Sequence, residues 1–258
     1  MLKITVLGTG ASGGIPIIGC DCGVCKSSNP KNKRSRVSIL LESATTKILV
    51  DTSPDLREQA LQNNITAIDA IIYTHSHADH LHGIDDVRSF NYQKNAAIDA
   101  YGDSATLAEI RERFAYTLML ANEYHNGWYR PCLNPLEITA GKAFKVGDIE
   151  ILPFEQIHGR GKSLGFRFGN FAYSTDVNVM PEQAFESLEG IDIWLVDCLR
   201  YLPAPSHSHL ERTLQWIERV KPKQAYLTHM HHEFDYDILA KELPSGVFPA
   251  YDGLVIEC

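Results

Sequence analysis

The fold of this chain is decided by the stretch Ile71-Ile-Tyr-Thr-His-Ser-His-Ala-Asp-His80. Its apolar first part predicts a strand, and its second part predicts a tight loop that carries three imidazoles and a carboxylate. Neutral imidazole and carboxylate are the usual ligands of zinc and similar divalent ions. Because alternate residues of an extended segment project to the same side, His75 and His77 can approach one ion while Asp79 and His80 face a second. The stretch therefore predicts a metal site.

Length and composition place the chain among ordinary globular proteins. Its 258 residues fit one large domain, and we expect a single domain over residues 1–258. The opening segment, Met1-Leu-Lys-Ile-Thr-Val-Leu-Gly, lacks the charged start, long apolar core and cleavage site of a signal peptide. No apolar run approaches the ~20 residues that are needed to cross a bilayer. We therefore expect a cytoplasmic protein without a membrane partner.

The charge balance bears on the class of partner. A net charge of −8 argues against a long polyanionic partner, because binding to a phosphate backbone needs a concentrated basic face. The exception is the basic run Lys31-Asn-Lys-Arg-Ser-Arg36, which we interpret as a solvated loop flanking the next strand in preference to a nucleic-acid contact. We expect no stable nucleic-acid partner. Small anionic substrates remain compatible, since bound metal ions would supply positive charge locally.

A glycine-rich turn follows the first predicted strand, which covers residues 3–7. The turn, Gly8-Thr-Gly-Ala-Ser-Gly-Gly14, satisfies the G-x-G-x-x-G pattern of dinucleotide-binding proteins. In those proteins the turn opens a helix, whereas here Pro16 and a cysteine cluster follow. We therefore predict a tight backbone turn that approaches the active centre closely.

The rest of the chain alternates predicted strands and helices. Strands are predicted over residues 38–42, 47–50, 98–101, 144–146, 149–154, 163–168, 170–174, 193–196, 225–227 and 253–257. Helices are predicted over residues 54–63, 83–93, 104–120, 181–188 and 208–220. Residues 121–135, with His125 as a surface residue, are interpreted as a lid or partner-contact loop. The repeated alternation favours an α/β fold in which two sheets pack together with helices outside.

Further candidate ligands follow predicted strands elsewhere in the chain. His75, His158, Asp176 and His229 each lie directly after a strand-like run. Since strand ends on one edge of a sheet stack converge in space, these side chains are expected to meet. Asp51 also ends a predicted strand, and two roles for it remain open: it orients the histidine loop, or it caps the following helix.

The motif Thr74-His-Ser-His-Ala-Asp-His80 strongly resembles the signature of the metallo-β-lactamase superfamily of binuclear hydrolases. The resemblance extends over essentially the whole chain and implies a four-layer αβ/βα sandwich. It implies two divalent ions, Zn or Mn, in the active site, with Asp79 also counted as catalytic. The implied ligands are His75, His77 and His158 for one ion, Asp79, His80 and His229 for the other, and Asp176 with a hydroxide as bridges.

A cysteine cluster, Cys20-x-Cys22-x-x-Cys25, supplies three thiolates at a spacing that suits zinc. Redox and iron–sulfur uses compete with this interpretation, and a closed tetrahedral site would need one more ligand. The remaining cysteines are solitary and are expected to be reduced, because a cytosolic chain rarely builds a disulfide framework. These are Cys132, Cys198 and Cys258.

Within the superfamily, the cysteine cluster and the Leu-Gly-Thr-Gly start resemble the PhnP-type cyclic phosphodiesterases. That resemblance implies a structural zinc with Cys20, Cys22, Cys25 and a histidine three residues after the last catalytic one. This histidine is His232 in Thr228-His-Met-His-His232, and its neighbour His231 is the alternative. PqqB-type proteins share the same features, so the subfamily stays open between the two.

The resemblance implies a metal-dependent phosphodiesterase that hydrolyses a small phosphodiester, such as a cyclic ribose phosphate or a nucleotide, through a bridging hydroxide. The departing alkoxide needs a proton, for which His207 is the first candidate and His209 the second. Arg160 and Lys162 either bind a second phosphate or are solvated charges. The alternative functions are a PqqB-like role in redox-cofactor biosynthesis and a tRNase Z-like RNA nuclease. Family resemblance further implies a homodimer.

Overall fold

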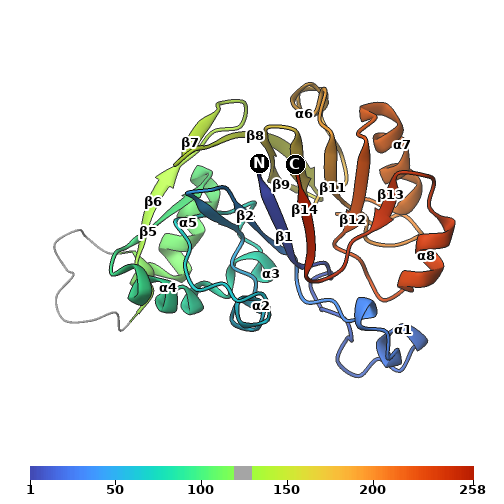
Figure 1. Cartoon of the computed structure of the whole chain (residues 1–258), viewed down its shortest axis with the longest axis horizontal. Helices are drawn as coiled ribbons and strands as arrows, with labels where there is room; N and C mark the ends of the chain where they lie inside the picture. The colour runs from blue at the N-terminus through green and yellow to red at the C-terminus, as the bar shows by residue number, and fades with distance from the viewer. Residues whose placement is uncertain (119–129) are drawn as a thin grey trace.

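Two mixed sheets of seven strands each stack face to face in the computed structural model, which describes residues 1–118 and 130–258 (Figure 1). The first sheet has the order β14 (Leu254–Glu257), β1 (Lys3–Gly8), β2 (Ser38–Glu42), β3 (Lys47–Val50), β4 (Ala70–Ile72), β5 (Ile98–Gly102) and β6 (Leu133–Glu137). The second has the order β13 (Val247–Pro249), β12 (Gln224–Thr228), β11 (Ile193–Asp197), β10 (Phe171–Ser174), β9 (Gly161–Phe168), β8 (Ile149–His158) and β7 (Phe144–Val146).

The two sheets repeat one design. In the first, β14, β1, β2 and β3 pair antiparallel, and β3 to β6 pair parallel. In the second, β7 to β10 pair antiparallel, and β10 to β13 pair parallel. Since parallel strands share their direction, the carboxyl ends of several strands come to one edge of each sheet. That edge carries the candidate site.

Burial on both faces explains the continuous apolar strands. Along β2, Ile39 and Leu41 join the core between the sheets, whereas Leu40 packs with the outer helices of the first sheet. Along β11, Leu195 faces the core between the sheets and Trp194 faces the outer helices of the second sheet. Alternate residues of a strand point to opposite faces, so a strand covered on both sides needs apolar residues at every position.

Helices cover the outer face of each sheet (Figure 1). The first sheet is covered by α2 (Leu56–Gln62), α3 (Ala78–Leu81), η2 (Ile84–Asp86), α4 (Val87–Lys94), α5 (Ser104–Arg113) and η3 (Ala115–Thr117). The second is covered by α6 (Glu182–Ser187), α7 (Leu210–Val220) and α8 (Tyr236–Glu242). The short segments α1 (Gly23–Lys26) and η1 (Pro30–Asn32) lie in the cysteine-bearing loop. The predicted four-layer αβ/βα sandwich is confirmed.

Two predicted elements need correction. The helix predicted over residues 104–120 ends at Arg113, because Phe114 leaves the helical conformation and a 3₁₀ turn follows. The loop predicted over residues 121–135 is in part a strand, since β6 begins at Leu133. β6 contains Pro135 and lies at the edge of its sheet, the position where a strand tolerates proline. Residues 119–129, and with them His125, lie outside the described residues.

The glycine-rich turn reaches the end of β12. Gly10 pairs with Arg36 and with Met230, and the backbone N–H of Ala11 donates to the carbonyl of Met230. A Cβ on Gly10 would lie 2.6 Å from the carbonyl oxygen of Arg34, so only glycine fits there. The predicted close approach to the active centre is therefore confirmed. No helix begins at the turn, in contrast to what a dinucleotide-binding turn would require.

The basic run of residues 31–36 is not a solvated loop. Arg34 is buried and donates to the backbone carbonyls of His231 and Phe234. The Lys31 ammonium lies 4.4 Å from the centre of the Tyr236 ring. The run therefore attaches the N-terminal loop to the C-terminal region, which corrects the sequence-based interpretation. In the part of the chain that the structure describes, no helix has the length and apolar character of a membrane span.

Candidate metal centre

Four strand ends meet at one edge of the sheet stack. His75 follows β4, His158 is the last residue of β8, Asp176 follows β10 and His229 follows β12. The loop that leads into α3 adds His77, and α3 itself adds Asp79 and His80, so seven candidate ligands form two adjoining groups that share Asp176. The groups are His75, His77, His158 and Asp176, and Asp79, His80, His229 and Asp176.

The Asp176 carboxylate faces both groups, one oxygen to each. Its Oδ1 lies 3.0 Å from Nε2 of His80 and 3.3 Å from Nε2 of His229. Its Oδ2 lies 3.4 Å from Nε2 of His158 and 3.7 Å from Nε2 of His75. A carboxylate with its two oxygens divided between two ligand groups is the arrangement that can bridge two cations.

Left-handed backbone marks the ends of the strands that carry the site. Asp51, Asp176 and His229 have φ values of 66°, 54° and 58°, although none of them is glycine. Such conformations are uncommon for non-glycine residues and concentrate at functional sites. Here each one turns a polar side chain out of its strand direction, toward the shared centre.

Buried polar atoms test whether this donor set fits metal ions. Within the described residues, the Nε2 atoms of His75, His80 and His229 are buried and make no hydrogen bond. An unpartnered buried ring nitrogen costs free energy unless a metal ion or another group satisfies it. Imidazole and carboxylate donors in two groups of four suit two divalent ions. The residues fit the implied binuclear site.

Hydrogen bonds on the far side of the rings fix their orientation. Nδ1 of His80 donates to Oδ2 of Asp51 at 2.7 Å, which leaves Nε2 free for an ion. Nδ1 of His158 donates to the carbonyl of Ser206 at 2.7 Å, with the same consequence. The Thr74 hydroxyl donates to Asp51, so it can accept from Nδ1 of His75, 3.0 Å away. Such partners set the tautomer and ring direction of metal-binding histidines.

Asp51 therefore orients the histidine loop, the first of the two roles left open by the sequence. Its carboxylate is fully buried, and it accepts from the backbone N–H of Thr74 as well as from the Thr74 side chain. Helix α2 begins after Asp55, so Asp51 does not cap it.

The electrostatics of the centre favour positive charge. Burial alone would raise the pKa of Asp176, but the imidazoles of His229 and His80 hold it well below its usual range. Burial would likewise lower the pKa of His80, yet the surrounding carboxylates Asp176, Asp79 and Asp51 raise it well above the usual value. A position with this charge balance attracts a proton or a metal cation.

His207, the first candidate for the general acid, lies beside the two groups. Its ring stacks on His229 with centroids 4.4 Å apart, and its Nε2 lies 3.8 Å from Oδ2 of Asp176. Nδ1 donates to Oδ2 of Asp197 at 3.0 Å. Burial lowers the pKa of His207, but the Asp197 carboxylate outweighs it and the pKa rises to about 9.

Asp197 was missed as a site residue by the sequence reasoning. It is the last residue of β11, as His158 is the last residue of β8. Its fully buried Oδ2 also accepts from the backbone N–H of Val177, which fixes the carboxylate against His207. The signal was present, because an apolar run followed by Asp repeats the pattern that had identified Asp176.

The other charged candidates are not among the grouped ligands. His209 is the residue before α7, and it belongs to none of the His/Asp groups found in the described part of the chain. Lys162 pairs with Glu155 at 2.7 Å on the surface, which supports the interpretation of a solvated charge. Arg160 is exposed in the turn between β8 and β9.

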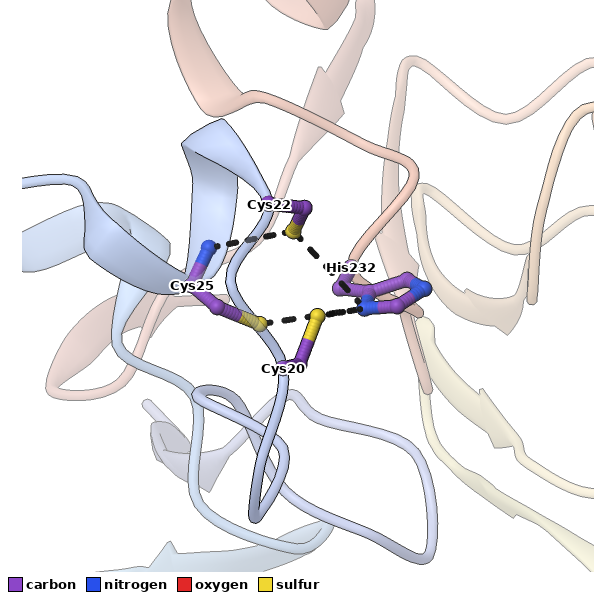
Figure 2. A group of neighbouring side chains, drawn as sticks. All are labelled: Cys20, Cys22, Cys25 and His232. Atoms are coloured by element: carbon purple, nitrogen blue, oxygen red, sulfur yellow. Dashed lines mark hydrogen bonds between the residues drawn. The ribbon is translucent and has the colours of Figure 1, made fainter.

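The cysteine cluster meets His232, and not His231 (Figure 2). The Sγ atoms of Cys20, Cys22 and Cys25 lie 3.1, 3.8 and 3.7 Å from Nδ1 of His232. Zn–S bonds of about 2.3 Å and Zn–N bonds of about 2.0 Å in a tetrahedron put ligand atoms about 3.5 Å apart, so these four atoms fit one zinc ion. All six cysteines of the chain are free of disulfides.

Comparisons with known proteins agree with this geometry. Residues 46–230 match the β-lactamase superfamily domain. The crystal structure of a diphosphatase from the PhnP family superposes with a TM-score of 0.92 at 36% sequence identity, and the match covers 100% of this chain and 98% of that one.

Two curated relatives extend the comparison. An octanoyltransferase of Porphyromonas gingivalis is 33% identical over 256 residues, which are 98% of this chain and 51% of the relative, so the chain spans about half its length. Coenzyme PQQ synthesis protein B of Cupriavidus necator is 25% identical over 315 aligned residues, covering 99% of each chain. The chain therefore belongs to the metallo-β-lactamase superfamily, as a metal-dependent hydrolase homologous to a diphosphatase of its PhnP family.

Proposed function

We propose that the chain hydrolyses a small phosphodiester, with a cyclic ribose phosphate or a nucleotide as the substrate class. The observation that carries the proposal is the Asp176 carboxylate, whose two oxygens face two separate ligand groups. The full-length likeness to a PhnP-family diphosphatase supports phosphorus as the atom attacked. A diphosphate and a phosphodiester share a phosphorus that carries two substituents, so one site can accept either class.

Two divalent ions, Zn or Mn, would be held by the two groups, with Asp176 shared between them. When bound, they supply Lewis-acid charge for the phosphoryl oxygens and lower the pKa of a water molecule toward neutrality. The roles of the protein are to place the ligands and to keep their lone pairs directed inward. Asp51 and the Ser206 carbonyl do this for His80 and His158.

His207 is proposed as the general acid. Its Nδ1 is held by Asp197, and its Nε2 points toward Asp176, from which it is 3.8 Å away. A proton on Nε2 can therefore pass to the oxygen that leaves phosphorus, while the Asp197 carboxylate stabilises the charged ring. Proton transfer of this kind contributes about 10²- to 10⁴-fold to rate.

The cysteine site is proposed to hold a structural zinc ion that does not contact the substrate. It joins residues 20–25 to His232, which lies three residues after His229, and so anchors the N-terminal loop to the end of β12. A homodimer in solution is part of the same proposal and can be checked by light scattering.

The test uses purified protein and bis(p-nitrophenyl) phosphate, before and after chelation and after Zn or Mn is restored. The proposal expects turnover that disappears with chelation and returns with metal. A diphosphate such as ADP and an octanoyl thioester serve as competing substrates, the latter because one relative is an octanoyltransferase. Turnover of the thioester with none of either phosphorus substrate would refute the proposal.

A role in coenzyme PQQ synthesis is the second candidate, favoured by the alignment of 99% of this chain with PQQ synthesis protein B. It predicts a fully metal-loaded protein that leaves small phosphodiesters and diphosphates untouched.

A further inference from the structure

A cavity of about 330 Å³ adjoins the metal centre and has no part in the proposed metal chemistry. One side is formed by the glycine-rich turn, with residues 11–15 and Ile17. The other side is formed by Leu199, His207 and His231. Small and apolar groups predominate in this lining, and two imidazoles interrupt it.

His207 is the wall that the cavity shares with the centre. Its ring stacks on His229, and its Nε2 lies 3.8 Å from Asp176. If His207 delivers the proton to the leaving oxygen, the group attached to that oxygen lies on the side of His207. The cavity is the space available on that side, so the leaving group would occupy the cavity. This step rests on the function proposed above.

Unpartnered polar groups line the cavity. Ser12 and Gly13 are exposed, and within the described residues their backbone N–H groups donate to no backbone carbonyl. Nδ1 of His231 is buried without a hydrogen-bond partner, the Glu233 carboxylate being 3.6 Å away. Ile15, Ile17 and Leu199 offer apolar contact to the same space. A ring with apolar faces and polar atoms on its edge matches such a lining.

We propose that this cavity binds the leaving alcohol of the substrate as a ring-bearing group, and that His231 and the turn at Ser12–Gly13 determine which alcohol is accepted. The apolar residues contact the faces of the ring, while the two N–H groups and the His231 imidazole bind its polar edge. His231 is thus a specificity residue, with a role separate from those of its neighbours in sequence.

The segment after β12 fixes the cavity relative to the metal centre. His229 faces the His/Asp groups, His231 faces the cavity and His232 faces the cysteines. Met230, between them, exchanges backbone hydrogen bonds with Thr9 and Ala11 of the turn at 2.8 and 3.1 Å. The N–H of His231 donates to the Leu199 carbonyl at 2.8 Å. Both walls of the cavity are therefore attached by backbone hydrogen bonds to the segment that follows β12 and supplies His229.

Gly13 offers a way to fill the cavity without disturbing the fold. Its backbone is outside the left-handed region, and a Cβ there would meet nothing nearer than Cγ1 of Ile17 at 3.7 Å. Gly14, by contrast, has a φ of +62° and would be strained by any side chain. Gly13→Leu is the cavity-filling variant and Gly13→Ala is its matched control.

The experiment measures kcat/KM for methyl phosphodiesters whose leaving group is p-nitrophenol or the larger 4-methylumbelliferone. Gly13→Leu is expected to lower the ratio of the umbelliferyl to the nitrophenyl value by about tenfold or more, and Gly13→Ala by much less. His231→Ala is expected to raise KM for both substrates with metal content unchanged. Replacing the methyl group of the substrate by phenyl, with p-nitrophenol still the leaving group, should change kcat/KM by the same factor in wild type and in Gly13→Leu.

The assignment would be overturned if Gly13→Leu lost kcat/KM equally on every substrate. It would also be overturned if the loss followed the size of the group that stays on phosphorus. If the wild-type protein hydrolyses none of these diesters, the proposed function fails, and the cavity is then tested by binding alone. In that case the fluorescence of free 4-methylumbelliferone is titrated against both proteins. Weaker binding by Gly13→Leu supports the cavity assignment, and equal or absent binding contradicts it.

Discussion

Nδ1 of His80 lies 2.7 Å from Oδ2 of Asp51, and both side chains are fully buried. The contact joins the residue after β3 to helix α3, and the two residues are 29 positions apart in sequence. It directs the other ring nitrogen of His80 at Asp176, 3.0 Å away. A residue that touches no candidate ion thus fixes the direction of one that does.

Replacing Asp51 by Asn tests this relationship. Asn tolerates the φ of 66° at this position, so the backbone should survive, while the anionic partner of His80 is lost. We expect metal affinity at the His/Asp cluster to fall by about 10- to 100-fold, measured by competition with a chelator. Asp55→Asn, at a nearby carboxylate outside the cluster, is the control. Equal affinities for all three proteins would exclude an orienting role.

Variants of His207 and His209 distinguish a catalytic histidine from a structural one. His207→Asn keeps a donor for Asp197 and removes the proton from the leaving-group side. We expect kcat for a phosphodiester to fall by about 10²- to 10⁴-fold, and to fall most for leaving alcohols of high pKa, with metal content intact. His209→Ala should leave kcat within about twofold of wild type, since His209 lies outside the ligand groups. Similar losses in both variants would point to a disturbed α7 instead of lost acid catalysis.

Cys22→Ser tests the structural zinc. The variant should lose one metal ion per chain while the His/Asp cluster keeps its own, because the two sites share no ligand. We expect Tm to fall by roughly 5–10 °C, since the ion binds only the folded chain. Elemental analysis and a thermal melt measure both effects. A melt and a zinc content that match wild type would remove the Cys3His assignment.

Asp252 gives a pH dependence of stability. It accepts from Thr9 and from the backbone and side chain of Ser35, but burial outweighs these contacts and raises the pKa of Asp252 to about 6. A carboxyl whose pKa is higher in the folded state stabilises the fold as pH drops through that value. Relative to Asp252→Asn, wild type should gain about 2 kcal/mol between pH 7 and pH 4.5.

Chemical denaturation of both proteins across that range measures the difference, and effects of metal release cancel in the comparison. A gap between the two curves that stays constant with pH would show that Asp252 is ionised throughout. A wild type that loses stability relative to Asp252→Asn toward pH 4.5 would reverse the sign and place the pKa of Asp252 below its usual value.

Much of the site could be predicted because four of the candidate ligands follow or end strands, namely His75, His158, Asp176 and His229. The strands were recognisable from their apolar runs, and parallel pairing brings their carboxyl ends together whatever the loops do. The resemblance to PhnP-type proteins favoured His232 over its neighbour His231, and His232 is the histidine that meets the cysteines.

Other features depend on contacts that no local pattern reveals. The apolar run before Asp197 marks it as a candidate site residue, but its partner His207, 3.0 Å away, is revealed only by the fold. Arg34 reads as a surface charge, yet its guanidinium is buried against the backbone after β12. Helix α8 was missed because its apolar positions are few and its start rests on one Asp235 cap. The first two features depend on residues more than five positions away in sequence, and the third on two short-range hydrogen bonds to the Asp235 side chain.

We expect two metal ions to share Asp176, and the metal content per chain tests this most directly. Asn tolerates the φ of 54° at this position, so Asp176→Asn should fold while losing the shared carboxylate. After dialysis against buffer free of metal, elemental analysis should find two ions at the His/Asp cluster and one at the cysteines in wild type. The variant should retain the cysteine-bound ion alone. An Asp176→Asn protein that keeps the full wild-type metal content would show that Asp176 is not a ligand shared by two ions.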